Sequence, residues 1–142
     1  MRKRTRAREL ALQALYQLDQ RGCEALELVD RLIDEGTAEP VVRLFARQLV
    51  EGCWSHREQL DAQIAAAAEN WEIRRMAVVD RNVLRLAAFE LLFLDDVPPK
   101  VAINEAVDLA KRYSTAESGA FVNGILDHIR LDRQRAAGAE GP

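Results

Sequence analysis

The sequence predicts an all-α protein, and three observations support this fold class. Apolar residues recur with the 3.6-residue period of a helix along most of the 142-residue chain. No stretch of useful length alternates apolar and polar residues, as a half-buried strand would. The length suits one domain, and a composition of 49% hydrophobic and 30% charged residues is typical of a soluble globular protein.

Six helical segments follow from the periodicity, with approximate bounds 5–20, 24–35, 40–68, 77–94, 101–113 and 117–133. Thr5 is the candidate N-cap of the first segment, because its hydroxyl can accept a hydrogen bond from a free backbone N–H. Gly22 and Gly36 end the first two segments. Pro40 fits the first turn of the third segment, which Gly52 either bends or divides in two.

The segment 77–94 is apolar nearly all round, which predicts a central, buried helix. Arg85 and Glu90 interrupt its apolar surface, and an unpaired buried charge costs several kcal/mol. Both residues therefore need partners or water. We expect Glu90 to form a buried hydrogen bond or ion pair, whereas Arg85 either does the same or projects outward toward a polyanion such as RNA.

The C-terminal part of the chain changes character at residue 134. Segment 117–133 has an apolar stripe, and Phe121 lies one position off it, so its ring is expected to be partly exposed; ordinary packing is the alternative that periodicity favours. Residues 134–142 lack such a stripe and are expected to form a disordered tail. The predicted domain is therefore 1–133.

Known catalytic and metal-binding patterns are missing from the sequence. There is no Gly-rich phosphate loop, HExxH or GxSxG motif, so we expect no enzyme and no cofactor. Cys23 and Cys53 are thirty residues apart and are expected to be small core residues, which argues against a metal site. Carboxylates are expected to solvate and pair, as Asp108 can with Arg112. No segment is long and apolar enough for a membrane span or a secretory signal, which predicts a cytoplasmic protein.

Charge is distributed unevenly along the chain. The net charge is −3, yet residues 1–8 contain five basic residues and no acidic one. Removing these five leaves 15 basic against 23 acidic residues in the remaining chain. A basic arm suits RNA and an acidic body suits a basic partner, while the simpler interpretation of the arm is a solvated tail.

The first segment carries a polar face distinct from its alanine-rich stripe. Five residues at helical spacing form this face: Arg6, Glu9, Gln13, Tyr16 and Gln20. Single-stranded RNA is bound by cations at its phosphates, by rings that stack on bases and by amides at base edges. Arg6, Tyr16 and Gln13 supply one of each, although Tyr16 is equally suited to half-buried packing.

Four stretches, in the same order and with similar separations, resemble the NusB family of transcription antitermination factors. They are RTRARELALQALYQ at 4–17, VDRNVLRLAAFELLF at 79–93, VPPKVAINEAVDLAKRY at 97–113 and FVNGIL at 121–126. The resemblance covers nearly the whole chain. It implies about seven helices in two small bundles that share one core.

The resemblance also implies a function without catalysis. Family members bind boxA RNA together with NusE, a ribosomal small-subunit protein that also acts in transcription. The pair joins the RNA polymerase elongation complex and suppresses termination, notably on ribosomal RNA operons. The residues implied to contact RNA are Arg4, Arg6, Gln13, Tyr16, Arg85 and Phe121. Those implied to face NusE are Asp80 and Glu117.

Two other functions are compatible with the same helices. Some ribosomal RNA cytosine methyltransferases carry a NusB-like N-terminal domain, although we expect no cofactor-binding domain after residue 142 here. A pure protein-interaction module is the second alternative, in which the basic arm is only a solvated tail. RNA binding at low and moderate salt distinguishes these possibilities.

Overall fold

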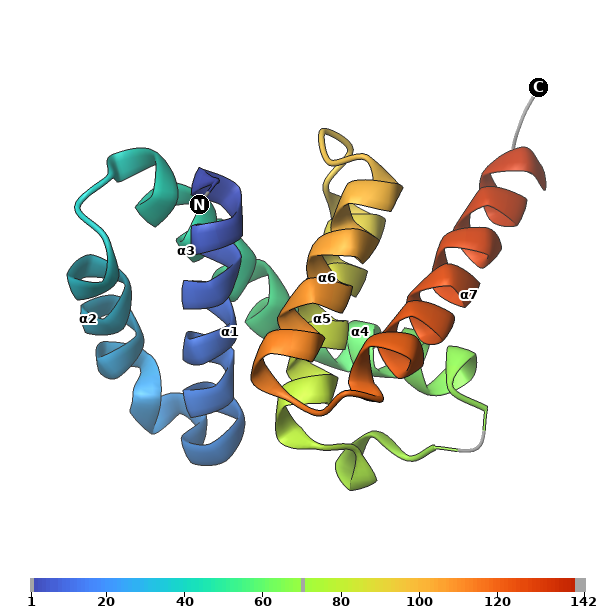
Figure 1. Cartoon of the computed structure of the whole chain (residues 1–142), viewed down its shortest axis with the longest axis horizontal. Coiled ribbons are helices and arrows are strands. Elements are labelled where there is room, and N and C mark those ends of the chain that lie inside the picture. Colours follow the sequence, from blue (N-terminus) through green and yellow to red (C-terminus); the bar gives the residue numbers. More distant parts are fainter. Residues whose placement is uncertain (1, 70, 140–142) are drawn as a thin grey trace.

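The computed structural model describes residues 2–69 and 71–139, and these residues fold into helices without a strand (Figure 1). The α-helices are α1 (Lys3–Arg21), α2 (Leu26–Gly36), α3 (Pro40–Ser55), α4 (Arg57–Ala67), α5 (Val78–Phe93), α6 (Pro99–Tyr113) and α7 (Ser118–Ala139). Two 3-10 turns connect them, η1 (Gly22–Ala25) and η2 (Ile73–Arg75). The predicted all-α class is confirmed, and the seven α-helices of the described residues agree with the number that the family resemblance implied, one more than periodicity predicted.

The helices form two bundles around a shared core. Helices α1, α2 and α3 pack together on one side of the molecule, and α4, α5, α6 and α7 pack together on the other (Figure 1). Helix α5 contacts both α1 and α3, and apolar side chains from both bundles form a single buried cluster. The predicted central helix is therefore the element that joins the bundles.

Arg8 and Glu90 form a buried ion pair between α1 and α5. Each side chain is at most 3% exposed, and Arg8 Nη2 donates to Glu90 Oε1 at 2.6 Å while its Nε donates to both carboxylate oxygens at 3.0 and 3.1 Å. Burial raises the pKa of Glu90, although the hydrogen bonds and charge of Arg8 act in the opposite direction. The expected buried partner of Glu90 is confirmed.

The two ends of α1 differ in how well the sequence predicted them. Gly22 ends the helix as expected, with a φ of +67° that favours glycine. Thr5 is not the N-cap, because α1 begins at Lys3 and places Thr5 inside the first turn. There its hydroxyl donates to Glu105 of α6 at 2.8 Å, a tertiary partner that local capping rules do not anticipate.

The third predicted segment is divided, at His56 and not at Gly52. Gly52 lies inside α3 where Phe89 of α5 packs against it, so closely that an added Cβ would lie 2.0 Å from Phe89 Cζ. His56 lies between α3 and α4, where its ring centroid is 4.3 Å from that of Phe93. Gly52 thus permits close packing of two helices, and the chain turns one helical turn later.

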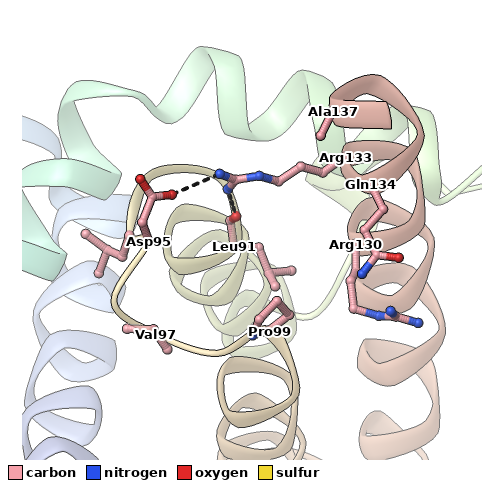
Figure 2. Close-up of a pocket in the computed structure, with 9 residues that line it drawn as sticks. Leu91, Asp95, Val97, Pro99, Arg130, Arg133, Gln134 and Ala137 are labelled. Atoms are coloured by element: carbon pink, nitrogen blue, oxygen red, sulfur yellow. Dashed lines mark hydrogen bonds and ion pairs between the residues drawn. The ribbon is translucent and has the colours of Figure 1, made fainter. Parts of the chain in front are cut away.

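Helix α7 continues beyond its predicted end, so the expectation of a disordered tail is wrong for residues 134–139; residues 140–142 lie outside the described residues. Figure 2 shows Arg133 reaching from α7 to the end of α5, where it donates to the Leu91 carbonyl and to Asp95 (3.1 Å). The last carbonyls of a helix lack partners within it, so Arg133 satisfies one of them. This contact holds α7 against the other bundle helices beside an open hollow of about 190 Å³.

Within the described ranges, no helix is long and apolar enough to cross a membrane, and no group of three or more His, Cys, Asp or Glu side chains is placed to hold a metal ion. Cys53 is buried as expected, and burial raises the pKa of its thiol well above the usual value. Cys23 is exposed, which the sequence did not anticipate, because it lies in the short turn η1.

Candidate nucleic-acid interface

The predicted polar face of α1 is present, with one exception. Gln13, Tyr16 and Gln20 are exposed, Tyr16 to 40%, whereas the alanine-rich stripe on the opposite side is buried. Tyr16 is therefore placed as a surface residue and is free for the ring stacking predicted for it. The exception is Glu9, which lies in the middle of this face yet is only 3% exposed.

Glu9 is covered by the C-terminal end of α6. Its Oε2 accepts hydrogen bonds from Tyr113 Oη at 2.5 Å and Arg112 Nη1 at 2.6 Å, and its Oε1 accepts one from Arg6 Nη1 at 3.4 Å. Burial by itself raises the pKa of Glu9, but the hydrogen bonds from Tyr113, Arg112 and Arg6 together lower it below the usual value. The sequence predicted that Arg112 would pair with Asp108, but in the structure it pairs with Glu9.

This cluster adds a cation and a ring to the predicted face. Tyr113 remains 41% exposed and the Arg112 side chain 46% exposed while both bind Glu9. Sequence reasoning missed both residues, because α6 and α1 are about a hundred residues apart in the chain. The run of Lys111, Arg112 and Tyr113 at a helix end was the only local signal.

The basic N-terminal arm is largely helical, so the described part of it is not a solvated tail. Arg4 donates to Asp96 at 3.0 Å, and its guanidinium carbon lies 4.3 Å from the Phe45 ring centroid. Arg6 donates to the Gly36 carbonyl at 3.0 Å. Both side chains stay substantially exposed, at 48% and 38%, so their cations remain accessible beside the polar face of α1.

Arg85 lies in a network that connects α1, α4 and α5. Its Nε and Nη2 donate to Asp61 at 2.7 and 3.0 Å, and its Nη1 donates to Asp19 at 2.9 Å and to Asn82 at 3.1 Å. Burial lowers the pKa of Arg85, but the bonds and charges of Asp61 and Asp19 together raise it. Because a guanidinium has five N–H groups, one Nη2 N–H is left without a partner among the described residues. The network therefore holds Arg85 in place and offsets most of its charge. Arg85 can offer a ligand one N–H donor in a fixed position but little net positive charge.

Arg81 completes this network and neutralises Asp19. Its Nε and Nη2 each donate to Asp19 at 2.7 Å. Burial by itself raises the pKa of Asp19, but the hydrogen bonds from Arg81 and Asn82 and the charges of Arg85 and Arg81 together lower it below its usual value. Since Asp19 follows Tyr16 by one helical turn, the network places Arg85 close to the C-terminal half of the α1 face.

Phe121 is half-buried at the start of α7 and packs against the hydrophobic core, so its ring is partly exposed and also takes the packing role that periodicity favoured. Its ring lies edge-to-face with Trp71, with centroids 5.6 Å apart and planes at 77°. Trp71 belongs to the connector between α4 and α5, to which sequence reasoning assigned no functional residue. A tryptophan followed within four positions by two arginines, between two predicted helical segments, was the available signal.

The two predicted partner-facing acids have different environments. Asp80, in the first turn of α5, is 9% exposed, and its Oδ1 is buried without a hydrogen-bond partner in the described part of the chain. A buried oxygen without a hydrogen bond lowers the stability of the fold by on the order of 1–3 kcal/mol. Glu117 is exposed just before α7, where its carbonyl accepts the Phe121 N–H at 3.2 Å.

Comparison with known proteins places the chain in a family. The model of the NusB family matches residues 5–130. The chain belongs to the NusB family. Its relatives include the transcription antitermination protein NusB of Syntrophus aciditrophicus, 46% identical over 96% of this chain and 89% of that protein, and that of Anaeromyxobacter dehalogenans, 52% identical over 89% of each.

Solved NusB structures share the fold of this NusB-family chain. Thermotoga maritima NusB superposes with a TM-score of 0.81 at 39% identity, covering 91% of each chain. A chain from the complex of antitermination factors NusB and NusE with double-stranded RNA gives a TM-score of 0.84 at 34% identity, covering 93% of this chain and 98% of that one. The family suggested by the four sequence stretches is therefore confirmed.

Proposed function

We propose that this NusB-family chain is a transcription antitermination factor that binds single-stranded boxA RNA together with NusE. The pair joins the RNA polymerase elongation complex and suppresses termination, notably on ribosomal RNA operons. The protein acts by binding and not by catalysis, in the cytoplasm where bacterial transcription takes place. Family membership carries this proposal, and a NusB relative was solved in complex with NusE and double-stranded RNA.

The surface chemistry of α1 supports RNA as the ligand. Arg4 and Arg6 provide accessible cations, Gln13 an exposed amide and Tyr16 an exposed ring on one helix. We assign Arg85 and Phe121 to the same RNA surface, Arg85 as a fixed donor and Phe121 as a second ring. These groups match what single-stranded RNA requires at its phosphates, base edges and base faces.

The acids Asp80 and Glu117 are proposed to face NusE. Ribosomal proteins are commonly basic, and acidic groups at an interface steer such partners. Glu117 is exposed to such a partner, whereas Asp80 Oδ1 is buried, so a partner donor reaches it only if the start of α5 rearranges.

One experiment tests the proposal directly. Binding of a labelled single-stranded boxA oligonucleotide is measured by fluorescence anisotropy with and without purified NusE, beside an oligonucleotide of the same length and scrambled sequence. We expect boxA to bind more tightly than the scrambled RNA, and NusE to strengthen boxA binding. Equal binding of both RNAs at every NusE concentration would refute boxA recognition, and no binding of either would favour the protein-interaction module.

A further inference from the structure

Residues 71–77 of the connector between α4 and α5 expose an aromatic ring and two cations together. Trp71 is 56% exposed, and the side chains of Arg74 and Arg75 are 81% and 74% exposed. Both arginines contact the same carboxylate, Glu72, at 2.8 and 3.7 Å. Two cations share one exposed anion, so residues 71–77 carry a net charge of +1, which the exposed Glu69 just before them offsets.

The connector is continuous with the proposed RNA surface at two points. Trp71 lies edge-to-face with Phe121. At its other end, the Arg74 carbonyl accepts a hydrogen bond from Arg81 Nη1 at 3.4 Å. An open hollow of about 600 Å³ is lined in part by Arg74, Arg81 and Arg85. The connector therefore links Phe121, which Trp71 contacts, to the network that holds Arg85, which Arg74 joins through Arg81.

We propose that this connector, with Trp71, Arg74 and Arg75, forms part of the RNA-binding surface. Trp71 stacks on a base beside Phe121, and the two arginines contact phosphates. The inference rests on the proposed function and extends its surface from the end of α1 across the α5 network to the start of α7. Stacking on exposed rings and cations placed beside them are the features by which proteins hold single-stranded RNA.

Charge favours RNA over a protein ligand at this surface. Three acids line the hollow beside these arginines: Asp19, Asp61 and Glu72. All three are already paired with arginines, the first two with Arg81 and Arg85 and the third with Arg74, so they leave little negative charge to repel phosphate. A basic protein such as the proposed partner would meet Arg74 and Arg75 with like charge, which opposes association. An apolar peptide could cover Trp71 but would leave both arginines without a role.

Fluorescence reports directly on Trp71. In the full-length Trp54→Phe variant, Trp71 is the remaining tryptophan, and addition of unlabelled boxA oligonucleotide is expected to quench its emission as the ring stacks on a base. The matched Trp71→Phe variant keeps only Trp54, which Arg57 covers, and is expected to change little. Quenching confined to the Trp54→Phe variant supports the inference, whereas equal responses of both variants contradict it.

Affinity and salt dependence test the two contact types separately. Trp71→Ala is expected to weaken boxA binding roughly fivefold to a hundredfold, and Trp71→Phe to restore most of the loss. The double variant Arg74→Gln/Arg75→Gln is expected to flatten the plot of log affinity against log salt by about 1.4, since each phosphate contact on a single strand contributes about 0.7. The control Arg31→Gln/Arg135→Gln removes the same charge from exposed positions on α2 and α7.

The outcomes distinguish this inference from the function on which it rests. One outcome would overturn the inference and leave the proposed function standing. In that outcome the wild-type protein binds boxA, Trp71→Ala binds it normally, and the Arg74/Arg75 double variant flattens the salt slope no more than the control does. The connector is then not part of the RNA surface. If wild-type protein does not bind boxA, both fail. If Trp71→Ala loses only NusE binding, with a native thermal melt, the connector belongs to the protein interface and the inference is overturned.

Discussion

Single residues in this protein show how a charge can be either structural or available to a ligand. Arg4 and Arg8 are about one helical turn apart in the basic N-terminal arm, yet Arg8 is 2% exposed and Arg4 is exposed. Arg8 is committed to Glu90 and lies within 3.4 Å of Glu105. The arm therefore contributes fewer cations to a polyanion than its sequence indicates.

Removing Arg8 leaves a buried carboxylate without its main partner. We expect Arg8→Met to lower the free energy of unfolding by about 3–5 kcal/mol, because an uncompensated buried charge is costly. The double variant Arg8→Met/Glu90→Leu is expected to recover most of that loss, since an apolar pair replaces the ions. Urea unfolding followed by circular dichroism measures both, with the exposed Arg57→Met as control. A double variant as unstable as the single one would contradict this account of the pair.

The proposed role of Tyr16 in stacking on an RNA base can be tested directly by substitution. Because its ring is on the surface, Tyr16→Ala is expected to weaken boxA binding roughly tenfold or more without a loss of thermal stability, and Tyr16→Phe to bind nearly normally. RNA titrations and thermal melts of both variants provide the measurement. A large drop in melting temperature with normal RNA binding in the cold would assign the ring to packing.

At the scale of helices, close approach sets where elements lie. Helices α3 and α5 approach each other at Gly52, where Phe89 occupies the space of a side chain. Helix α7 has a glycine of a different kind, Gly124, which is exposed and has no atom near the position of an added Cβ. Gly52 is therefore needed for the close packing of α3 and α5, whereas Gly124 has no packing role and only weakens its helix.

These two glycines predict opposite effects of one substitution. Gly52→Ala is expected to destabilise the protein by about 1–3 kcal/mol, because the methyl group overlaps the Phe89 ring and forces the helices apart. Gly124→Ala is expected to stabilise it by about 0.5–1 kcal/mol through helix propensity alone. Chemical denaturation compares the two variants with wild type. Equal stability of both variants would show that the α3–α5 contact relaxes without cost.

Across the whole molecule, Glu9 joins one bundle to the other through Arg112 and Tyr113. The pKa of Glu9 in the folded protein lies below its usual value of 4.5. Ionised Glu9 therefore stabilises the fold above about pH 4.5, and this contribution disappears as the pH falls through the lower folded pKa. Burial raises the pKa of Glu90, so that residue contributes with the opposite sign.

The substitution Glu9→Gln isolates this contribution. We expect the variant to be less stable than wild type at neutral pH and the difference to shrink as the pH is lowered below 4.5, because protonated Glu9 and the glutamine that replaces it are then both uncharged. Thermal melts between about pH 3 and about pH 7 span the range in which linkage acts, with Glu27→Gln at an exposed position as control. A constant difference across that range would contradict the linkage.

Charge segregation across the molecule predicts that its two proposed ligands can be uncoupled. Asp80→Asn keeps the shape of a buried side chain, and Glu117→Lys reverses an exposed charge without disturbing the core. Both are expected to weaken NusE association by about 1–3 kcal/mol where the acid is desolvated, and less where it stays at the rim, while RNA binding by the isolated protein is retained. Titration calorimetry against NusE that gives wild-type affinity for both variants would place the interface elsewhere.

The sequence by itself determined the approximate positions of the helical segments and most of the buried face of α1 and α5. Helical periodicity is a local property, so the central helix at 77–94, the end of α1 at Gly22 and the exposed side of α1 with Tyr16 were predictable. The need of Glu90 for a partner was predictable too, because burial of a charge demands one. Four short stretches were sufficient to indicate the family.

Only the tertiary structure decided which residues meet. Glu90 finds Arg8 across 82 positions, and Glu9 finds Arg112 across 103, whereas the sequence suggested a local partner for Arg112. Arg85 is held by Asp19 and Asp61, and α7 continues past residue 133 beside the end of α5. In each case the decisive energy comes from a side chain on another helix. Helical periodicity specifies only the face on which a residue lies, and the packing of the helices determines the partner that faces it.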